Sequence, residues 1–255
     1  MASNGISPVP VTMNAESSTP VLSNLHKDTL SPPPPAVGAP VKPVKICVFC
    51  GSSPGKSPAH MEAARALAQV MARNNIQLVY GGGTVGLMGE VARTLVSLSG
   101  PESVHGIIPT ALVQYEAGPN SATESSDLPA YATYGKTTVV NSMHERKEMM
   151  VKEIVDAGAG SGFVALSGGY GTLEELMEVV TWNQLGIHER GVCVLNIEGY
   201  WDGLLQWVEG SVEAGFVGLK NRSIISEAKN GEEAVEFLRV YVPEEGRFKL
   251  KWGNE

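Results

Sequence analysis

The stretch "VALSGGYGTLEELMEVV", from Val164 to Val180, decides which fold to expect, because two different patterns of apolar residues meet at one glycine turn. An apolar run leads into the glycines, and apolar residues then recur every three to four positions. The first pattern is typical of a buried strand and the second of an amphipathic helix. A strand that enters a helix through a glycine turn is the repeating unit of a parallel α/β sheet.

The same unit recurs along the chain from Lys45 onward. The strand segments are apolar without alternation, which indicates a doubly wound parallel sheet with helices on both faces. A long polar loop, of a kind that is often functional, is expected over 109–130. We expect strands over 45–50, 76–80, 103–109, 131–140, 162–166 and 191–197, and helices over 58–75, 87–100, 142–157, 172–186, 200–215 and 230–242.

Composition divides the chain into two parts. Residues 1–43 hold nine of the 16 prolines and show almost no apolar periodicity, so they cannot bury enough surface to offset the entropy of ordering. We therefore expect a disordered Pro/Ser-rich tail over 1–43 and a single folded domain over 44–255. The tail has neither the apolar core of a signal peptide nor the arginines of a transit peptide.

Charge and cysteine usage exclude several classes of function. The net charge of −8 argues against a nucleic-acid surface, and no apolar run reaches about 20 residues, so no membrane span is expected. Cys47 and Cys50 form a CxxC spacing, but they lie in an apolar strand and have no second pair of ligands at matching spacing. We expect buried structural thiols, no metal site and a reduced, cytoplasmic setting.

Three glycine-rich turns follow strands, over 51–53, 81–86 and 168–171, and should meet at the carboxyl ends of the sheet. The second turn fits GxGxxG, which favours a phosphate at the following helix N-terminus. The next strand ends without a carboxylate, which disfavours NAD or FAD, and no P-loop motif occurs. Close helix–strand packing is the alternative explanation of these small residues.

The third turn raises a question, because carboxylates follow a loop suited to an anion. Thr172 and Glu175 have the spacing of a capping box, in which Thr172 caps the helix and Glu175 reaches back to it. The alternative is a catalytic carboxylate beside a bound phosphate. Cleavage of a glycosidic bond develops a sugar cation that such a carboxylate stabilises, and a nucleotide carries phosphate and sugar together.

A second helix start points to the same chemistry. Ser142 is the expected N-cap, with Glu145 as its capping-box partner. Arg146 and Lys147 then lie near the helix N-terminus, where the dipole disfavours cations, which suggests a compensating anion. A solvated basic patch is the alternative.

These motifs resemble the LONELY GUY (LOG) family of cytokinin riboside 5′-monophosphate phosphoribohydrolases, over about 45–241. The family signature PGGxGTxxE corresponds to "SGGYGTLEE", and its M-H-x-R-K signature to "MHERK". The segments "VFCGSSPG" and "VYGGGTVGLMG" are similar to the family's first two loops. The resemblance implies a Rossmann-like fold, a homodimer, no cofactor, and hydrolysis of a cytokinin nucleotide to free base and ribose 5-phosphate.

The resemblance also implies site residues. Arg146 and Glu175 fall on the catalytic positions of the motifs. The substrate, a nucleoside 5′-monophosphate, would contact residues of both signatures, of the first two loops, of the long loop and of the helix over 172–186: Glu116, Lys147, Gly169, Tyr170, Gly171, Thr172, Leu173, Glu174, Thr181, Gly82, Gly83 and Ser52.

Two features depart from the family pattern. Ser167 replaces the motif proline, which restores an N–H group and frees φ. About six extra residues in "VDAGAGSG" separate Arg146 from Glu175, and we expect them to form a loop between helix and strand.

Other functions remain open at this point. A broader nucleosidase would act on AMP itself, whereas a cytokinin enzyme needs an apolar base cavity, for which Met88, Met143 and Trp182 are candidates. A non-catalytic nucleotide or cofactor carrier would use Glu175 only as a helix cap. A lysine decarboxylase would need a Schiff-base lysine for pyridoxal phosphate, and no motif marks one.

Overall fold

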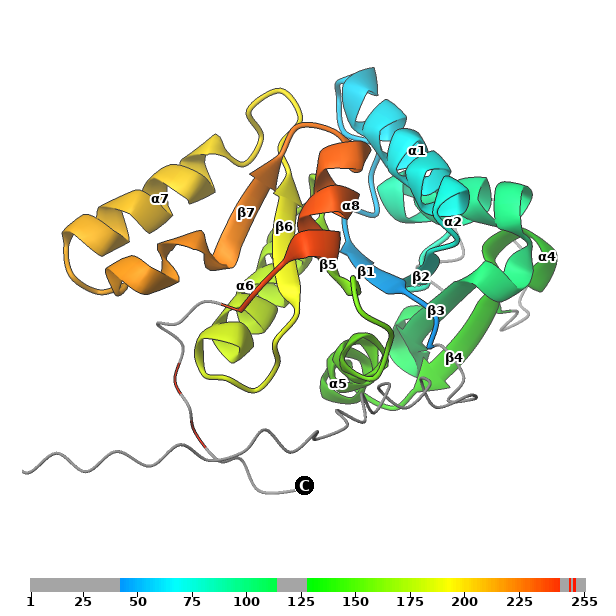
Figure 1. Cartoon of the computed structure of the whole chain (residues 1–255). Coiled ribbons are helices and arrows are strands. Elements are labelled where there is room, and N and C mark those ends of the chain that lie inside the picture. Colours follow the sequence, from blue (N-terminus) through cyan, green and yellow to red (C-terminus); the bar gives the residue numbers. More distant parts are fainter. Residues whose placement is uncertain (1–41, 114–127, 244–247, 249, 251–255) are drawn as a thin grey trace, which may run out of the picture. The chain divides into compact units, whose positions relative to one another are not determined.

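The computed structural model describes residues 42–113, 128–243, 248 and 250, and in this part seven parallel strands form one sheet in the order β4-β3-β2-β1-β5-β6-β7 (Figure 1). The predicted parallel α/β class is therefore confirmed. The strands are β1 Lys45–Phe49, β2 Gln77–Tyr80, β3 Val104–Pro109, β4 Lys136–Val140, β5 Gly162–Ala165, β6 Gly191–Leu195 and β7 Ile225–Ala228. The α-helices are α1 Pro58–Arg73, α2 Gly86–Ser99, α4 Tyr131–Tyr134, α5 Met143–Val155, α6 Tyr170–Gln184, α7 Asp202–Glu213 and α8 Gly231–Val240. Short 3₁₀ helices are η1 Pro101–Ser103, η2 Thr110–Leu112 and η3 Leu219–Ile224.

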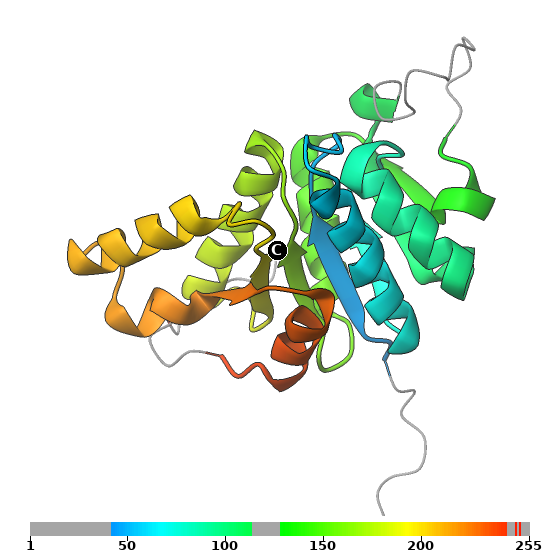
Figure 2. The same cartoon turned by 90° about the horizontal axis from the view of Figure 1, so that it is seen from above.

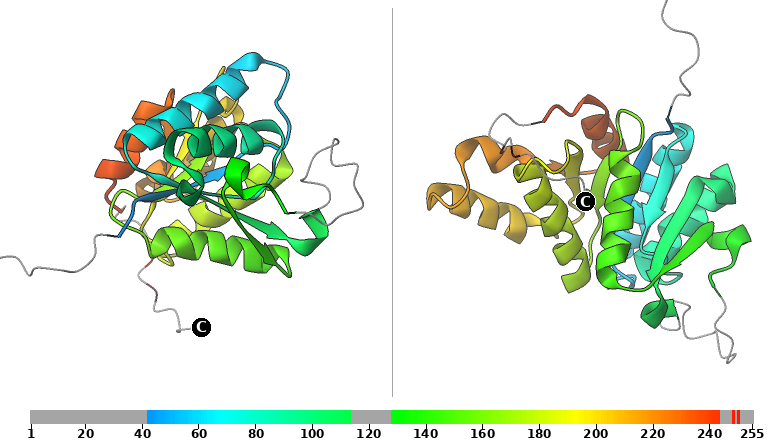
Figure 3. Two further views of the ribbon diagram at one scale, coloured as in Figure 1. Left: turned by 90° about the vertical axis from the view of Figure 1, so that its right-hand side faces the viewer. Right: turned by 90° about the horizontal axis from the view of Figure 1, so that it is seen from below.

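Both faces of the sheet are buried at its central strands, which explains why β1, β2, β5 and β6 are largely apolar. Ile46 and Val48 of β1 belong to the core under α1, α2 and α8. Cys47 and Phe49, which point the other way, belong to the core under α5, α6 and α7. In the left view of Figure 3, α1 and α2 cover one face and α5 the other.

The strand order places a topological switch point at β1. The chain builds β2, β3 and β4 on one side of β1 and then returns to place β5 on the other side. The loops after β1 and β5 are joined there, because Gly51 N donates to Ser167 O at 3.0 Å. Sheets of this kind bind ligands at such a point, beyond the carboxyl ends of the strands.

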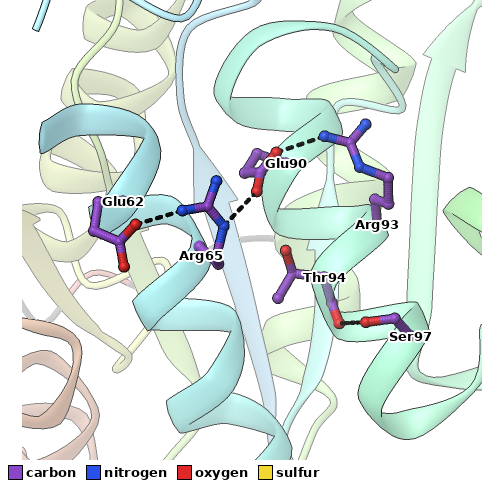
Figure 4. A network of polar contacts seen from close by, with 6 residues as sticks. All are labelled: Glu62, Arg65, Glu90, Arg93, Thr94 and Ser97. Carbon is purple, nitrogen blue, oxygen red and sulfur yellow. Dashed lines mark hydrogen bonds and ion pairs between the residues drawn. The ribbon is translucent and has the colours of Figure 1, made fainter. Parts of the chain in front are cut away.

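The helices α1 and α2 lie side by side (Figure 2) and are linked by a buried carboxylate. Glu90 of α2 accepts hydrogen bonds from Arg65 Nε at 2.9 Å and from Arg93 Nη2 at 2.5 Å (Figure 4). Arg65 also pairs with Glu62 on its own helix. Two guanidinium groups thus compensate the buried charge, and α2 is held against α1 close to the turn that follows β2.

The structure differs from the sequence-based expectation at two elements. The strand expected over 131–140 is split by Gly135, which has a φ of +79° and ends α4 before β4 begins. The last strand, β7, was not expected, because "ISEA" is short and half polar. The predicted tail over 1–43 lies outside the described residues except for 42 and 43, as do residues 114–127 of the predicted loop.

The extra residues before β5 form a turn, as expected, and leave α5 regular to Val155. The half-buried Arg190 donates to the carbonyl oxygens of Val155 at 2.6 Å, Ala157 at 2.7 Å and Gly158 at 3.1 Å. A cation at a helix C-terminus also complements the helix dipole. The insertion is therefore fixed in place and does not displace the helix that carries Arg146.

A half-buried carboxylate, Glu153 of α5, makes stability depend on pH. Burial raises its pKa, but hydrogen bonds from His105 and Lys45 outweigh burial and lower the pKa from 4.5 to about 2. A lowered pKa contributes stability above pH 4.5, which is lost as the pH falls toward 2. From pH 5 to pH 3, Glu153 should account for a loss of about 2 kcal/mol in the free energy of unfolding.

Urea unfolding at pH 5 and pH 3 checks this prediction. The Glu153→Gln variant should lose less stability than the original chain between the two pH values. Glu232→Gln is the matched control, because Glu232 forms a mostly exposed pair with Arg73. Equal pH dependence in all three proteins would contradict the prediction.

Candidate active site

The start of helix α5 agrees with the prediction from its sequence. Ser142 is the N-cap, and its Oγ accepts a hydrogen bond from Glu145 N at 3.1 Å. The Glu145 carboxylate reaches back to Asn141 N at 2.8 Å, one residue before the cap. Arg146 and Lys147 follow, only 6% and 9% exposed, so a solvated basic patch is the wrong description of these two cations.

The start of helix α6 differs from its predicted form. Gly169, not Thr172, is the N-cap, and the helix begins at Tyr170. The reason lies in Gly168, where a Cβ would stand 2.1 Å from Thr172 Oγ1, so the missing side chain lets the turn close onto the helix. Glu175 is therefore not a capping residue. Its side chain is 8% exposed, and its Oε1 lies 3.4 Å from Arg146 Nη2.

A cavity of about 220 Å³ opens at this Arg146–Glu175 pair. Arg146 Nε is buried and has no hydrogen-bond partner among the described residues, so the guanidinium keeps a donor for a ligand. Met88 and Met143 line the cavity as expected, whereas Trp182 packs against the core under α5 to α7. The full lining is Val48, Cys50, Gly51, Ser52, Gly81, Met88, Met143, Arg146, Gly169, Gly171, Thr172, Glu174 and Glu175.

The turn after β2 contributes a glycine that the sequence-based site did not include. A Cβ on Gly81 would stand 2.0 Å from Arg146 Nη2, so only glycine leaves room for the guanidinium. Gly82 and Gly83 are buried and do not line this cavity. The N–H groups of Leu87 and Met88 donate to Gly51 O at 3.0 and 3.3 Å. This helix start is already occupied, which favours the packing explanation of the GxGxxG turn over a phosphate site.

Lys147 is held beside the cavity by two carboxylates. Its Nζ lies 2.5 Å from Glu174 Oε1 and 2.7 Å from Glu178 Oε2. Burial lowers the pKa of Lys147, but the hydrogen bonds to Glu174 and Glu178 outweigh burial and raise it. A Schiff-base lysine needs the opposite shift, toward a neutral amine. Lys147 therefore does not fit pyridoxal phosphate.

Of the remaining residues predicted to contact substrate, those that the structure describes do not line the cavity at Arg146 and Glu175. Tyr170 and Leu173 line a neighbouring apolar cavity of about 660 Å³, which Trp207 and Leu204 also line. Thr181 is exposed on α6 and lines neither cavity, and its Oγ1 donates to Met177 O at 2.7 Å. Glu116 lies outside the described residues.

The cysteines are structural, as expected. Cys47, Cys50 and Cys193 are buried and form no disulfide bond. Burial raises the pKa of Cys47 well above its usual value and that of Cys193 to about 12. In the described part of the chain, no three His, Cys, Asp or Glu side chains gather in a way that could hold a metal ion.

Sequence reasoning missed His60 and Tyr200, which contact the glycine turn at 167–168 from outside. His60 Nδ1 lies 3.0 Å from Ser167 Oγ, and Tyr200 Oη donates to Gly168 O. Both line a third cavity of about 460 Å³, and Ser52 lines this cavity as well as the cavity at the Arg146–Glu175 pair. The serine in place of the motif proline was the available signal, since a buried hydroxyl needs a partner.

The single parallel sheet, with helices on both faces and the loops after β1 and β5 joined at the switch point, defines a Rossmann-like α/β protein. The chain belongs to the LOG family, as the resemblance indicated. A family model described as "Possible lysine decarboxylase" matches residues 88–238.

Three relatives support the family assignment. "Cytokinin riboside 5′-monophosphate phosphoribohydrolase LOG2" of Arabidopsis thaliana is 41% identical, over 82% of this chain and 90% of that protein. LOG7 of the same plant is 43% identical, over 82% and 88%. A "Bifunctional cytokinin biosynthesis protein" of Fusarium pseudograminearum is 54% identical over 83% of this chain, which spans only 43% of that longer protein.

Solved structures support the fold alone. The molybdenum cofactor binding protein of Rippkaea orientalis has a TM-score of 0.51 at 17% identity, with 79% of this chain and 98% of that chain covered. The Moco carrier protein of Chlamydomonas reinhardtii has a TM-score of 0.50 at 17% identity, with 76% and 94% covered.

Proposed function

We propose that this chain hydrolyses the N-glycosidic bond of cytokinin riboside 5′-monophosphates and releases the free cytokinin base and ribose 5-phosphate. The observation that carries the proposal is the buried Arg146–Glu175 pair, with its side chains 3.4 Å apart in the N-terminal halves of α5 and α6 beside one cavity. The names of the Arabidopsis relatives, which include this activity, support it.

The α6 N-terminus supplies the place for the substrate phosphate. The first N–H groups of a helix have no acceptor within the helix, and the dipole favours an anion there. Gly169, Gly171 and Thr172 all line the cavity at this point. With the phosphate held by these groups, the ribose lies toward Arg146 and Glu175.

Glu175 has the properties needed for the bond cleavage. As the C1′–N bond breaks, its electron pair moves to the base nitrogen and positive charge develops on the ribose. The Glu175 carboxylate stabilises this charge and accepts a proton from the water that attacks C1′, a proton from solvent water neutralises the leaving base, and Glu175 then releases its proton to solvent. Arg146 fixes the carboxylate and offers Nε to the substrate.

Product analysis by chromatography tests the proposal. The purified protein is incubated separately with isopentenyladenosine 5′-monophosphate, AMP and isopentenyladenosine. Release of isopentenyladenine from the monophosphate alone supports the proposed activity and the need for a phosphate. Equal or faster release of adenine from AMP would make the protein a general nucleosidase. No base from a folded protein that binds the nucleotide would make it a carrier.

A homodimer is part of the proposal. Thr181, exposed and outside the cavity of its own chain, could contact substrate only in the site of a second copy. Tyr170 is 95% exposed and Trp207 55%, so apolar side chains next to the site lie open to a partner. Light scattering after gel filtration measures the mass, and a monomer at micromolar concentration would refute the dimer.

We also propose a cytoplasmic location, which the three buried cysteines without a disulfide bond support. Among the described residues, no helix has the length and apolarity needed to cross a bilayer. The net charge of −8 supports a small-molecule partner over nucleic acid. Fractionation of cells that express the chain tests the location.

A further inference from the structure

The turn that starts α6 is held by side chains from two distant segments. Ser167 Oγ meets His60 Nδ1 at 3.0 Å, and His60 lies in the first turn of α1. The next residue, Gly168, offers its carbonyl oxygen to Tyr200 Oη, which comes from the segment between β6 and α7. Two consecutive residues of the turn are thus fixed from outside, immediately before the N-cap Gly169.

His60 is itself held in one orientation. The Tyr200 ring meets its ring edge-on, with centroids 5.8 Å apart. Gly55 also lies close to the ring, since a Cβ there would approach His60 Cδ2 to 3.1 Å. The imidazole therefore presents Nδ1 to Ser167 at little further entropic cost.

Ser167 connects this group to the opposite loop of the site. Its side chain is 7% exposed, and its carbonyl oxygen accepts the hydrogen bond from Gly51 N at 3.0 Å. A proline at this position would fix φ near −65° by its ring alone. Serine leaves φ free, so any rigidity at this point has to come from contacts.

We propose that His60 is a positioning residue for the substrate phosphate and acts through its hydrogen bond to Ser167. The bond replaces the conformational restriction of the motif proline, and Tyr200 supports it at Gly168. Gly169, Gly171 and Thr172 follow this turn in the chain. Fixing the turn therefore also fixes the positions of their N–H groups, which would bind the phosphate. The inference rests on the proposed function for the place of the phosphate, but it concerns binding as well as turnover.

A double-mutant cycle with Ser167→Pro tests the proposal. His60→Phe keeps an aromatic ring against Tyr200 and removes the hydrogen bond, whereas His60→Asn keeps a polar atom near the position of Nδ1. Each substitution is made twice, once in the original chain and once together with Ser167→Pro. Dissociation constants for ribose 5-phosphate and KM and kcat for isopentenyladenosine 5′-monophosphate are measured, with thermal unfolding as the control for folding.

With serine at position 167, His60→Phe should weaken ribose 5-phosphate binding about fivefold to tenfold and raise KM similarly, as expected for one lost hydrogen bond in the site. His60→Asn should recover most of this loss. With proline at that position, His60→Phe should change binding less than about twofold, because the ring already restricts the turn.

Two results would overturn the proposal: equal losses from His60→Phe in both backgrounds, or no loss in either. The binding measurement separates this outcome from a failure of the proposed function. A chain that releases no base but shows the coupling in ribose 5-phosphate binding would keep the positioning role and lose the hydrolase activity.

Discussion

Glu175→Gln should lower kcat by about a thousandfold and leave nucleotide binding intact or slightly tighter. The amide keeps the shape of the side chain but can neither accept the proton from water nor stabilise a sugar cation. Removing a negative charge close to the phosphate also removes a repulsion, so the dissociation constant of ribose 5-phosphate should stay level or fall. Single-turnover kinetics and calorimetric binding measure the two effects.

Glu174→Gln is the matched control for this substitution. Glu174 is the neighbouring carboxylate and lines the same cavity. Its side chain, however, is 53% exposed and forms an ion pair with Lys147. We expect its loss to lower kcat less than about tenfold. If the two variants behaved alike, or if Glu175→Gln kept most of its turnover, Glu175 would not be the catalytic carboxylate.

Gly81→Ala should lower kcat about a hundredfold without unfolding the protein, although residue 81 carries no functional group. The new Cβ would stand 2.0 Å from Arg146 Nη2 and 3.2 Å from Met88 Sδ, so the guanidinium has to move by more than 1 Å. Displacement of a catalytic group by about 1 Å can cost a factor of 10² in rate. Steady-state kinetics and thermal unfolding of the same preparation check the prediction.

Gly210→Ala controls for the general effect of replacing a glycine. Gly210 lies in α7, and a Cβ there would meet nothing within 4 Å. Its replacement should leave kcat unchanged and stabilise the helix by about 0.5–1 kcal/mol. Normal activity of Gly81→Ala would show that the guanidinium can act from another position.

The fold could be predicted from the sequence because its signals are local and repeated. Apolar runs alternate with amphipathic helical segments, three of the runs end in glycine turns, and this pattern was sufficient for six of the seven strands and for the helices on both faces. The strand β7 was not predicted, because Ser226 and Glu227 make half of it polar. Its place is set by pairing with β6, which no local pattern reports.

The candidate site was predictable in its residue types and less so in its geometry. The motifs indicated Arg146 and Glu175, and the structure brings them together across 29 positions of sequence. Spacing could not decide whether Glu175 caps its own helix, because that depends on where the turn at Gly168 lets the helix begin. The role of Gly81 could not be predicted, because it depends on the absence of a side chain. Only the structure shows that the Arg146 guanidinium fills the space where a Cβ would be.

The central position of β1 has a consequence for synthesis of the protein on the ribosome. One edge of β1 pairs with β2, which follows within about 30 residues, but its other edge waits for β5, because Ile46 pairs with Gly162. More than a hundred residues therefore emerge while this apolar strand keeps an open edge, and unpaired edges of this kind promote aggregation. The nascent chain depends on one short segment, Gly162–Ala165, to cover the second edge of β1, and chaperone protection matters most before that segment arrives.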